Sequence, residues 1–171
     1  LFRSAGRDGD VVRRYFNNAF GLSDFQLLPA KTWQMDGGPT TNDFRNVFDP
    51  HQGDLRKRIL SADKYSGVEE MDIFLYYRGY GEWVDGKPLL IPKNAKITRN
   101  ITKYPLEQLV KNLSLLSVLG NIKTITLFLD ITYTNPKKST GSNWDFPDLS
   151  EKICILSAAS NGETSQVYEI G

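Results

Sequence analysis

Two short stretches of this sequence place polar side chains directly after apolar runs, where binding and catalytic residues often gather. The stretch Thr124 to Asn135 (TITLFLDITYTN) carries the carboxylate of Asp130 and the hydroxyl of Thr132 near its end. The apolar run Met71 to Tyr77 (MDIFLYY) continues into Arg78-Gly79-Tyr80-Gly81. Together the two stretches offer an acid, a hydroxyl, a guanidinium and a phenol. These groups can bind a polar ligand, whereas a hydroxyl nucleophile would need an adjacent base.

A cysteine and histidine pair would give stronger nucleophilic chemistry, but the chain holds a single Cys154 and a single His51. Cys154 lies within an apolar stretch, and we expect a buried, inert thiol in a short strand. His51 lies in a turn-rich loop, and we expect it at the surface. With one cysteine an internal disulfide is excluded. We expect no bound metal and no cofactor.

The apolar, β-branched-rich run from Thr124 predicts a strand covered on both faces, as in a parallel sheet with helices on each side. Met71 to Tyr77 predicts a second strand of this kind. In open α/β sheets, ligands bind at the carboxyl ends of the strands. The fold class predicted from the sequence is therefore α/β, with the polar residues of both stretches at one edge of the sheet.

The remaining elements follow from periodicity and turn residues. Helices are expected over Leu1 to Phe20, over Asp54 to Ala62, and from Tyr104-Pro105 to Gly120. Strands are expected over Ser23 to Leu28 and Lys152 to Ser157, and a hairpin with Asp85-Gly86 as its turn over Glu82 to Asn94. Long loops are expected over Lys31 to Gly53, with one helical turn around Asp43 to Val47, and over Pro136 to Ser150.

The length and charge of the chain limit the classes of function that it can have. With 171 residues, 40% of them hydrophobic, the chain can form one domain with its own core. Lys and Arg number 21 against 20 for Asp and Glu, so the overall charge indicates neither a nucleic-acid nor an acidic-membrane partner. No apolar run approaches the ~20 residues of a membrane span. We expect a soluble protein and favour a cytoplasmic location.

The polar ends of the two strands resemble the caspase-like cysteine peptidases, in particular the bacterial metacaspases and orthocaspases. That family ends one strand in Tyr-Tyr-Ser-Gly-His-Gly, which carries the base, and the next in Asp-Ala-Cys-Phe-Ser-Gly, which carries the nucleophile. The corresponding stretches here are Tyr76 to Gly81 and Asp130 to Asn135. Tyr80 stands where the family has its histidine, and Thr132 stands where it has its cysteine.

The resemblance implies a three-layer α/β sandwich with a mostly parallel central sheet flanked by helices. It spans roughly Ala5 to Gly171. We expect residues 1–171 to form a single domain that lacks the first strand and the C-terminal helix and strand of the family. In the family, the next strand ends near the substrate groove, which here corresponds to Ser157 and Ala158.

The resemblance also implies roles for individual residues. Asp130 lies where metacaspases recognise Arg or Lys, and Arg78, unusual for the family, is expected to pair with it or to block the pocket. A simple strand-end cap is the alternative role for Asp130. Gly79 and Gly81 are expected to keep a tight turn with exposed backbone N–H groups. Tyr80 is expected to pack against a neighbouring aromatic ring, from Tyr77 or Trp83.

Three functions remain open from the sequence. The first is a caspase-like domain without peptidase activity that binds a protein or peptide partner, with basic side chains in that partner, as a scaffolding or regulatory module. The second is an active hydrolase that uses Thr132 as its nucleophile. The third is an unrelated doubly wound domain that binds a small ligand between the two strands.

Overall fold

The computed structural model describes residues 3–22, 26, 38–65, 70–96, 99–134, 146 and 149–158. Within them, five strands form one mixed sheet in the order β3-β2-β1-β4-β5. The strands are β1 (Met71–Val84), β2 (Lys87–Ile91), β3 (Tyr104–Pro105), β4 (Ile122–Tyr133) and β5 (Ile153–Ser157). The α/β class predicted from the sequence is confirmed.

The sheet has a parallel half and an antiparallel half. β4 lies between β1 and β5 and is parallel to both, whereas β2 is antiparallel to β1 and to β3. The expected hairpin is present, with Asp85 at φ 51° and Gly86 at φ 75°. Two successive positive φ angles are what a two-residue hairpin turn requires. The sheet is therefore mixed, with a parallel core formed by β1, β4 and β5.

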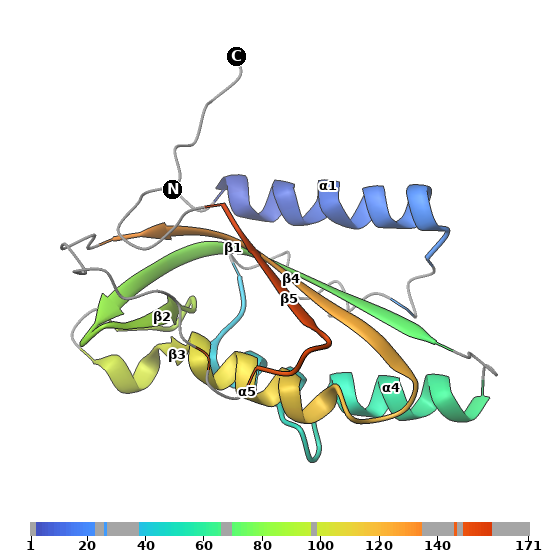
Figure 1. The fold of residues 1–171 in the computed structure, drawn as a ribbon. Helices are drawn as coiled ribbons and strands as arrows, with labels where there is room; N and C mark the ends of the chain where they lie inside the picture. The colour runs from blue at the N-terminus through green and yellow to red at the C-terminus, as the bar shows by residue number, and fades with distance from the viewer. Residues whose placement is uncertain are drawn as a thin grey trace.

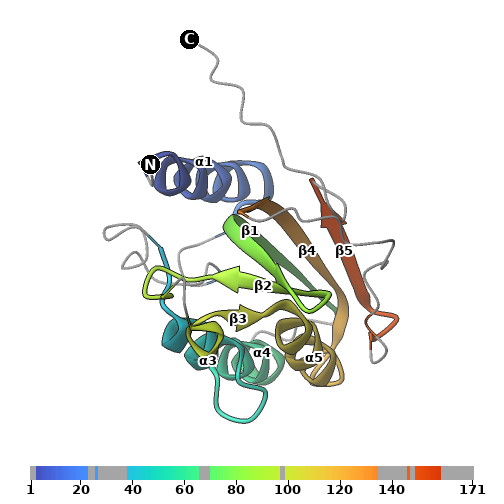
Figure 2. The ribbon, with the colours of Figure 1, turned by 90° about the vertical axis from the view of Figure 1, so that its left-hand side faces the viewer.

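Helices lie on both faces of the sheet, which gives three layers (Figures 1 and 2). Helix α1 (Arg3–Phe20) lies on one face, and α3 (Thr41–Phe48), α4 (Asp54–Tyr65) and α5 (Leu106–Leu116) lie on the other. A short 3-10 turn, η1 (Asn100–Thr102), precedes β3. None of the helices within the described ranges combines the length and apolar character that a membrane span requires.

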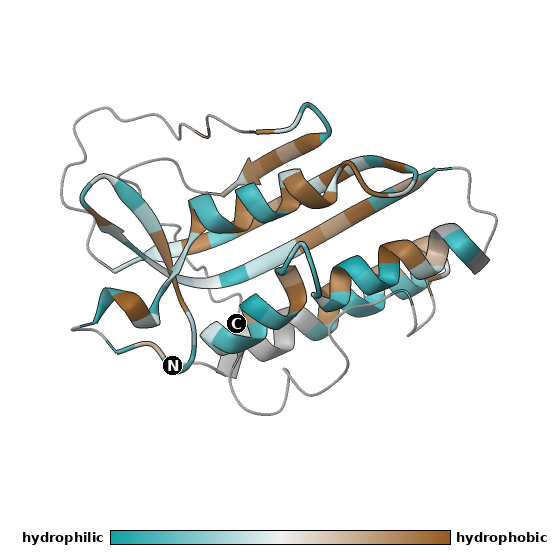
Figure 3. Ribbon diagram, turned by 90° about the horizontal axis from the view of Figure 1, so that it is seen from below, coloured by the Kyte–Doolittle hydropathy of each residue, from teal (hydrophilic) through white to brown (hydrophobic). Residues whose placement is uncertain are grey.

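The core lies between β4 and the helices on the α5 side. From Ile125 onward, every second residue of β4 is buried, and these positions pack against a stripe of α5 with helical spacing. Figure 3 views the molecule from this side and shows hydrophilic and hydrophobic turns alternating along the helices. The central side chains are Ile125, Leu127, Leu129 and Ile131 of β4 with Leu109, Leu113 and Leu116 of α5.

The opposite face of β4 is only half-buried, so the expected covering of this strand is complete on one face and partial on the other. Its side chains alternate with the core residues and include Thr126, Asp130 and Thr132. The apolar run is nearly continuous in the sequence, but its burial has a period of two, which marks a strand with one fully buried face. On this face α1 contacts β1 through Phe16 and Phe74, whose ring centroids are 5.4 Å apart.

The least regular part of the sequence contains a full helix. α3 has two turns instead of the expected single turn, because Thr40 and Asp43 form a capping box at its start. The Thr40 backbone N–H donates to Asp43 Oδ2 over 2.7 Å, and the Asp43 N–H donates to Thr40 Oγ1 over 3.2 Å. The strand expected at Ser23 to Leu28, and most of the loop expected after Pro136, lie outside the described residues.

Candidate functional site

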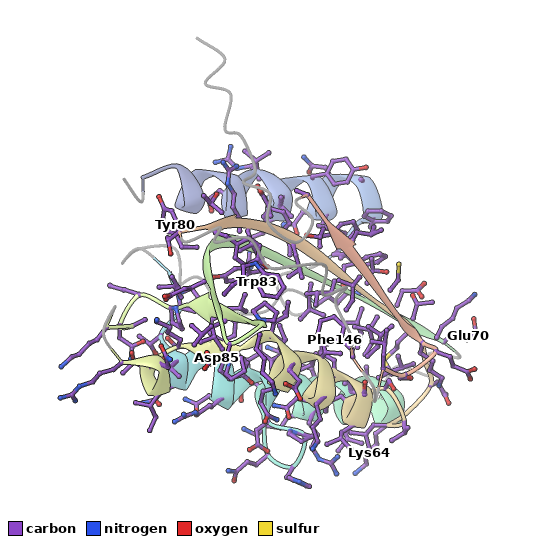
Figure 4. The ribbon with its side chains drawn as sticks, turned by 60° about the vertical axis from the view of Figure 1, so that its left-hand side comes forward. Lys64, Glu70, Tyr80, Trp83, Asp85 and Phe146 are labelled. Carbon is purple, nitrogen blue, oxygen red and sulfur yellow. The ribbon has the colours of Figure 1, made fainter. Side chains whose placement is uncertain are left out.

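The carboxyl ends of β1 and β4 bring four predicted site residues together. The register of these parallel strands pairs Arg78 with Asp130 and Tyr80 with Thr132. Because parallel partners share a face, and alternate residues of a strand do too, the four side chains form two adjacent pairs on the α1 side of the sheet. Figure 4 shows Tyr80 on that side of β1. Tyr80 and Thr132 are thus neighbours, as the interpretation of the sequence requires.

Arg78 and Asp130 form an ion pair. Nε of Arg78 lies 3.3 Å from Oδ2 of Asp130, and their side chains are 24% and 29% exposed. Partial burial reduces screening by salt, so this pair is stronger than one at a fully exposed surface. The expected pairing of the two residues is confirmed. Asp130 lies within β4 rather than beyond it, so it is not simply a strand-end cap.

Tyr80 and Thr132 are both half-buried. A phenol and an aliphatic hydroxyl each donate and accept hydrogen bonds, so this pair suits a polar backbone or side-chain group of a ligand. Neither group resembles the imidazole that activates a nucleophile in hydrolases. Among the residues that the structure describes, no cluster of three or more His, Cys, Asp or Glu side chains is placed to hold a metal ion.

Gly79 and Gly81 lie inside β1, so the expected tight turn at these positions is wrong. Both glycines lie flat against large side chains on the core face. A Cβ atom at Gly79 would lie 2.6 Å from Oη of Tyr77, and one at Gly81 would lie 2.6 Å from Cγ2 of Ile131 and 2.9 Å from Cε1 of Tyr133. The strand therefore needs glycine for side-chain packing, and β1 continues for seven residues beyond Tyr77 to Val84.

The packing on the core face also fixes the backbone beneath Tyr80. Oη of Tyr77 donates a hydrogen bond to the carbonyl oxygen of Tyr80 over 3.1 Å. The expected contact between these two tyrosines is thus a bond to the backbone. Burial raises the pKa of Tyr77, and the nearby Tyr133 adds to that shift. A neutral phenol at this position keeps its proton and remains a donor.

Among the residues that the structure describes, two buried polar atoms on the core face have no hydrogen-bond partner. They are Nε1 of Trp83 and the hydroxyl of Tyr133, and both are buried. The ring centroids of Trp83 and Tyr133 are 5.5 Å apart. Burial also raises the pKa of Tyr133. Each unpaired buried donor costs roughly 1–3 kcal/mol, which the aromatic packing over Gly81 must offset.

Ser157 is the last residue of β5 and Ala158 follows it, but the Ser157 side chain does not lie on the same face as the four site residues. Ser157 is exposed and is the register partner of Leu129, a core-facing residue, so its side chain lies on the α5 side. The N–H of Ala158 donates to the carbonyl oxygen of Leu129 over 2.9 Å. The backbone here borders Asp130, whereas the Ser157 side chain does not join it.

Cys154 and His51 lie apart from these residues. Cys154 is exposed, so its expected burial is wrong. It is the register partner of Thr126, on the half-covered face of the outermost described strand. Thr126 precedes Thr132 by six residues, which is ~20 Å along a strand. His51 is exposed in the turn after α3, as expected.

Sequence reasoning missed the packing role of Tyr77, Gly79, Gly81, Trp83 and Tyr133. The signal was available, because aromatic and glycine residues occupy every second position from 77 to 83. That period of two is typical of a strand in which large side chains lie over glycines.

No protein-family model matches the sequence, and no curated protein matches it either.

Proposed function

We propose that this chain is a caspase-like domain that has lost peptidase chemistry and acts as a protein-binding, scaffolding or regulatory module. The proposal rests on one observation, the register that makes Tyr80 and Thr132 partners on adjacent parallel strands. These are the positions at which the resembled family carries its histidine base and cysteine nucleophile.

The side chains near these positions support the loss of catalysis. In an active peptidase, a base must accept the proton of the nucleophile within hydrogen-bond reach. Here a phenol faces a threonine hydroxyl. The single thiol, that of Cys154, lies ~20 Å along the sheet from Thr132, at ~3.3 Å per strand residue. Removing both members of a catalytic pair eliminates most of the rate enhancement that such a pair provides.

The ion pair supports a role in binding. By its likeness to metacaspases, Asp130 is the residue that would hold an Arg or Lys side chain of a partner. In this chain the guanidinium of Arg78 occupies one side of that carboxylate. A partner's cation must share Asp130 with Arg78 or displace it, so Arg78 lowers the affinity of the site for basic peptides.

Peptide binding and covalent labelling test the two halves of this proposal. We expect no turnover of Arg or Lys peptide reporters and no labelling by an activity-based acylating probe. We expect the same peptides to bind without cleavage in a calorimeter, and Asp130→Asn to weaken that binding. Labelling of the wild type that is lost in Thr132→Ala would overturn the pseudoenzyme assignment in favour of a threonine hydrolase. Peptide binding that Asp130→Asn leaves unchanged would overturn the assigned site.

A further inference from the structure

The segment from Lys87 to Lys103 concentrates positive charge in a chain whose total charge is almost neutral. It contains five basic residues and no acidic residue, whereas the whole chain has a net charge of only +1. Two of the five are neutralised within the fold. Lys87 pairs with Glu107 over 2.9 Å, and the buried ammonium of Lys103 pairs with Glu82.

The other three basic residues, Lys93, Lys96 and Arg99, are exposed. Within the part of the chain that the structure describes, they form no ion pair with an acidic side chain. Three acids on neighbouring elements are engaged elsewhere: Asp43 accepts from the Thr40 cap, and Glu82 and Glu107 are paired with lysines. These three cations therefore form a positively charged surface. We call the segment that carries them, from Lys93 to Arg99, the basic loop.

The described positions of the basic loop are tied together by hydrogen bonds. Oγ1 of Thr102 accepts from the N–H of Lys96 over 2.8 Å and donates to the carbonyl oxygen of Arg99 over 2.7 Å. Asn94 anchors the loop to α3, since its Oδ1 accepts from the N–H of Thr41 over 2.9 Å. Preorganised cations lose less conformational entropy on binding than cations on a mobile loop.

One large apolar side chain projects beside these cations. Ile101, in η1, is 82% exposed, although it follows Arg99 by only two residues. An apolar side chain among exposed cations fits a partner in which acidic residues flank an apolar one. The described residues of this segment include no exposed aromatic ring, so base stacking on nucleic acid is not favoured. A single isoleucine also gives less apolar area than interfacial membrane binding normally uses.

We propose that the basic loop is a docking surface for an acidic protein segment that carries an apolar residue, held by Lys93, Lys96 and Arg99 around Ile101. The loop begins beside the candidate site, because Ile91 at the end of β2 is the register partner of Tyr80. The docking proposal does not depend on the pseudoenzyme assignment, because none of the residues in the basic loop belongs to the Tyr80 and Thr132 pair.

A short peptide of glutamates around a central leucine is the probe, with binding followed by fluorescence anisotropy. We expect a variant with Lys93, Lys96 and Arg99 all changed to Ser to bind about tenfold more weakly, which corresponds to ~1.4 kcal/mol. The charge-matched control changes Lys57, Lys111 and Lys123 to Ser and should bind within about twofold of the wild type. Binding should also weaken as the salt concentration rises.

Ile101→Ser separates the apolar contact from the charge. It should weaken binding of the leucine peptide severalfold and leave binding of a serine-centred glutamate peptide unchanged. The proposal is overturned if the loop variant and the control lose affinity equally, or if the wild type does not bind the peptide. It is equally overturned if phosphatidylserine vesicles or a single-stranded oligonucleotide bind more tightly than the peptide through the same three cations.

Discussion

Gly81→Ala is the substitution for which the structure gives the sharpest expectation. The added methyl group would lie 2.6 Å from Cγ2 of Ile131 and 2.9 Å from Cε1 of Tyr133. Unstrained carbon atoms approach to ~3.5–4.0 Å, so Ile131 has to retreat by about 1 Å. Ile131 is completely buried among the core side chains and has little space in which to do so. The backbone φ at Gly81 is not positive, so packing alone opposes the alanine.

The magnitude follows from two opposing effects. Overpacking a well-filled core costs ~1–3 kcal/mol. Replacing glycine by alanine reduces the entropy of the unfolded chain and returns ~0.4–1 kcal/mol. We therefore expect Gly81→Ala to lower the free energy of unfolding by about 1–2 kcal/mol, and the melting temperature by about 2–8 °C for a chain of this length.

A double-mutant cycle identifies the contact responsible. Ile131→Ala alone should cost ~2–5 kcal/mol because it leaves a cavity in the core. In the double variant the methyl group added at position 81 fills part of that cavity. The loss of unfolding free energy in the double variant should therefore be smaller than the sum of the two single losses by about 1 kcal/mol or more. Urea unfolding followed by far-UV circular dichroism and tryptophan fluorescence measures all four proteins.

Gly86→Ala provides the matched control. Its φ is +75° and nothing lies within 4 Å of the added Cβ, so its cost is backbone strain without a packing partner. Gly86→Ala and Ile131→Ala should therefore be additive within ~0.5 kcal/mol. If Gly81→Ala is also additive with Ile131→Ala, or if it stabilises the protein, the packing explanation for this glycine is refuted.

Three further outcomes follow from the described contacts. The contribution of Tyr104 to stability should be constant below pH ~10 and fall as the pH rises from ~10 towards about 12, because burial raises the pKa of Tyr104 to about 12 above an unfolded value near ~10, and Tyr104→Phe should remove that part of the alkaline loss in urea melts. Lys103→Met should destabilise the fold by ~3–5 kcal/mol, because it leaves Glu82 without its buried partner, and Glu82→Gln in the same chain should recover part of the loss. Arg78→Ala should raise the affinity of lysine peptides severalfold in calorimetry, whereas unchanged affinity would show that Arg78 does not compete for Asp130.

Much of the fold was predictable because its main signals are local. The buried stripe of α5, the Asp85-Gly86 turn and the strand beginning at Met71 follow from spacing and turn chemistry within short windows. α3 is longer than predicted because the pairing of Thr40 with Asp43 three residues later is a cap that the prediction missed. β1 extends beyond its predicted end because its glycines are not a turn, and their role depends on Ile131 and Tyr133, which are distant in the sequence.

The candidate site was predictable in its members and not in its arrangement. Adjacent parallel strands make Tyr80 and Thr132 neighbours, which the two apolar runs could indicate. The side of the sheet that each residue faces depends on register and on which helices cover which face. For this reason the prediction from the sequence placed Ser157 near Asp130, whereas alternation along β5 puts the two side chains on opposite faces. It also predicted a buried Cys154, whereas the thiol is exposed.

The two faces of β1 carry different kinds of side chain, and the packed face supports the residues of the candidate site. Residues 78 and 80 present a charge and a phenol to the α1 side, while residues 77, 79, 81 and 83 pack on the core side. Two contacts on the core face hold β1 in place. They are the hydrogen bond from Tyr77 to the carbonyl oxygen of Tyr80 and the close fit of Gly81 against Ile131. A binding residue on a strand is most precise when the opposite face is rigidly packed. The packing of these glycines therefore gives Tyr80, and Thr132 beside it on β4, a fixed position.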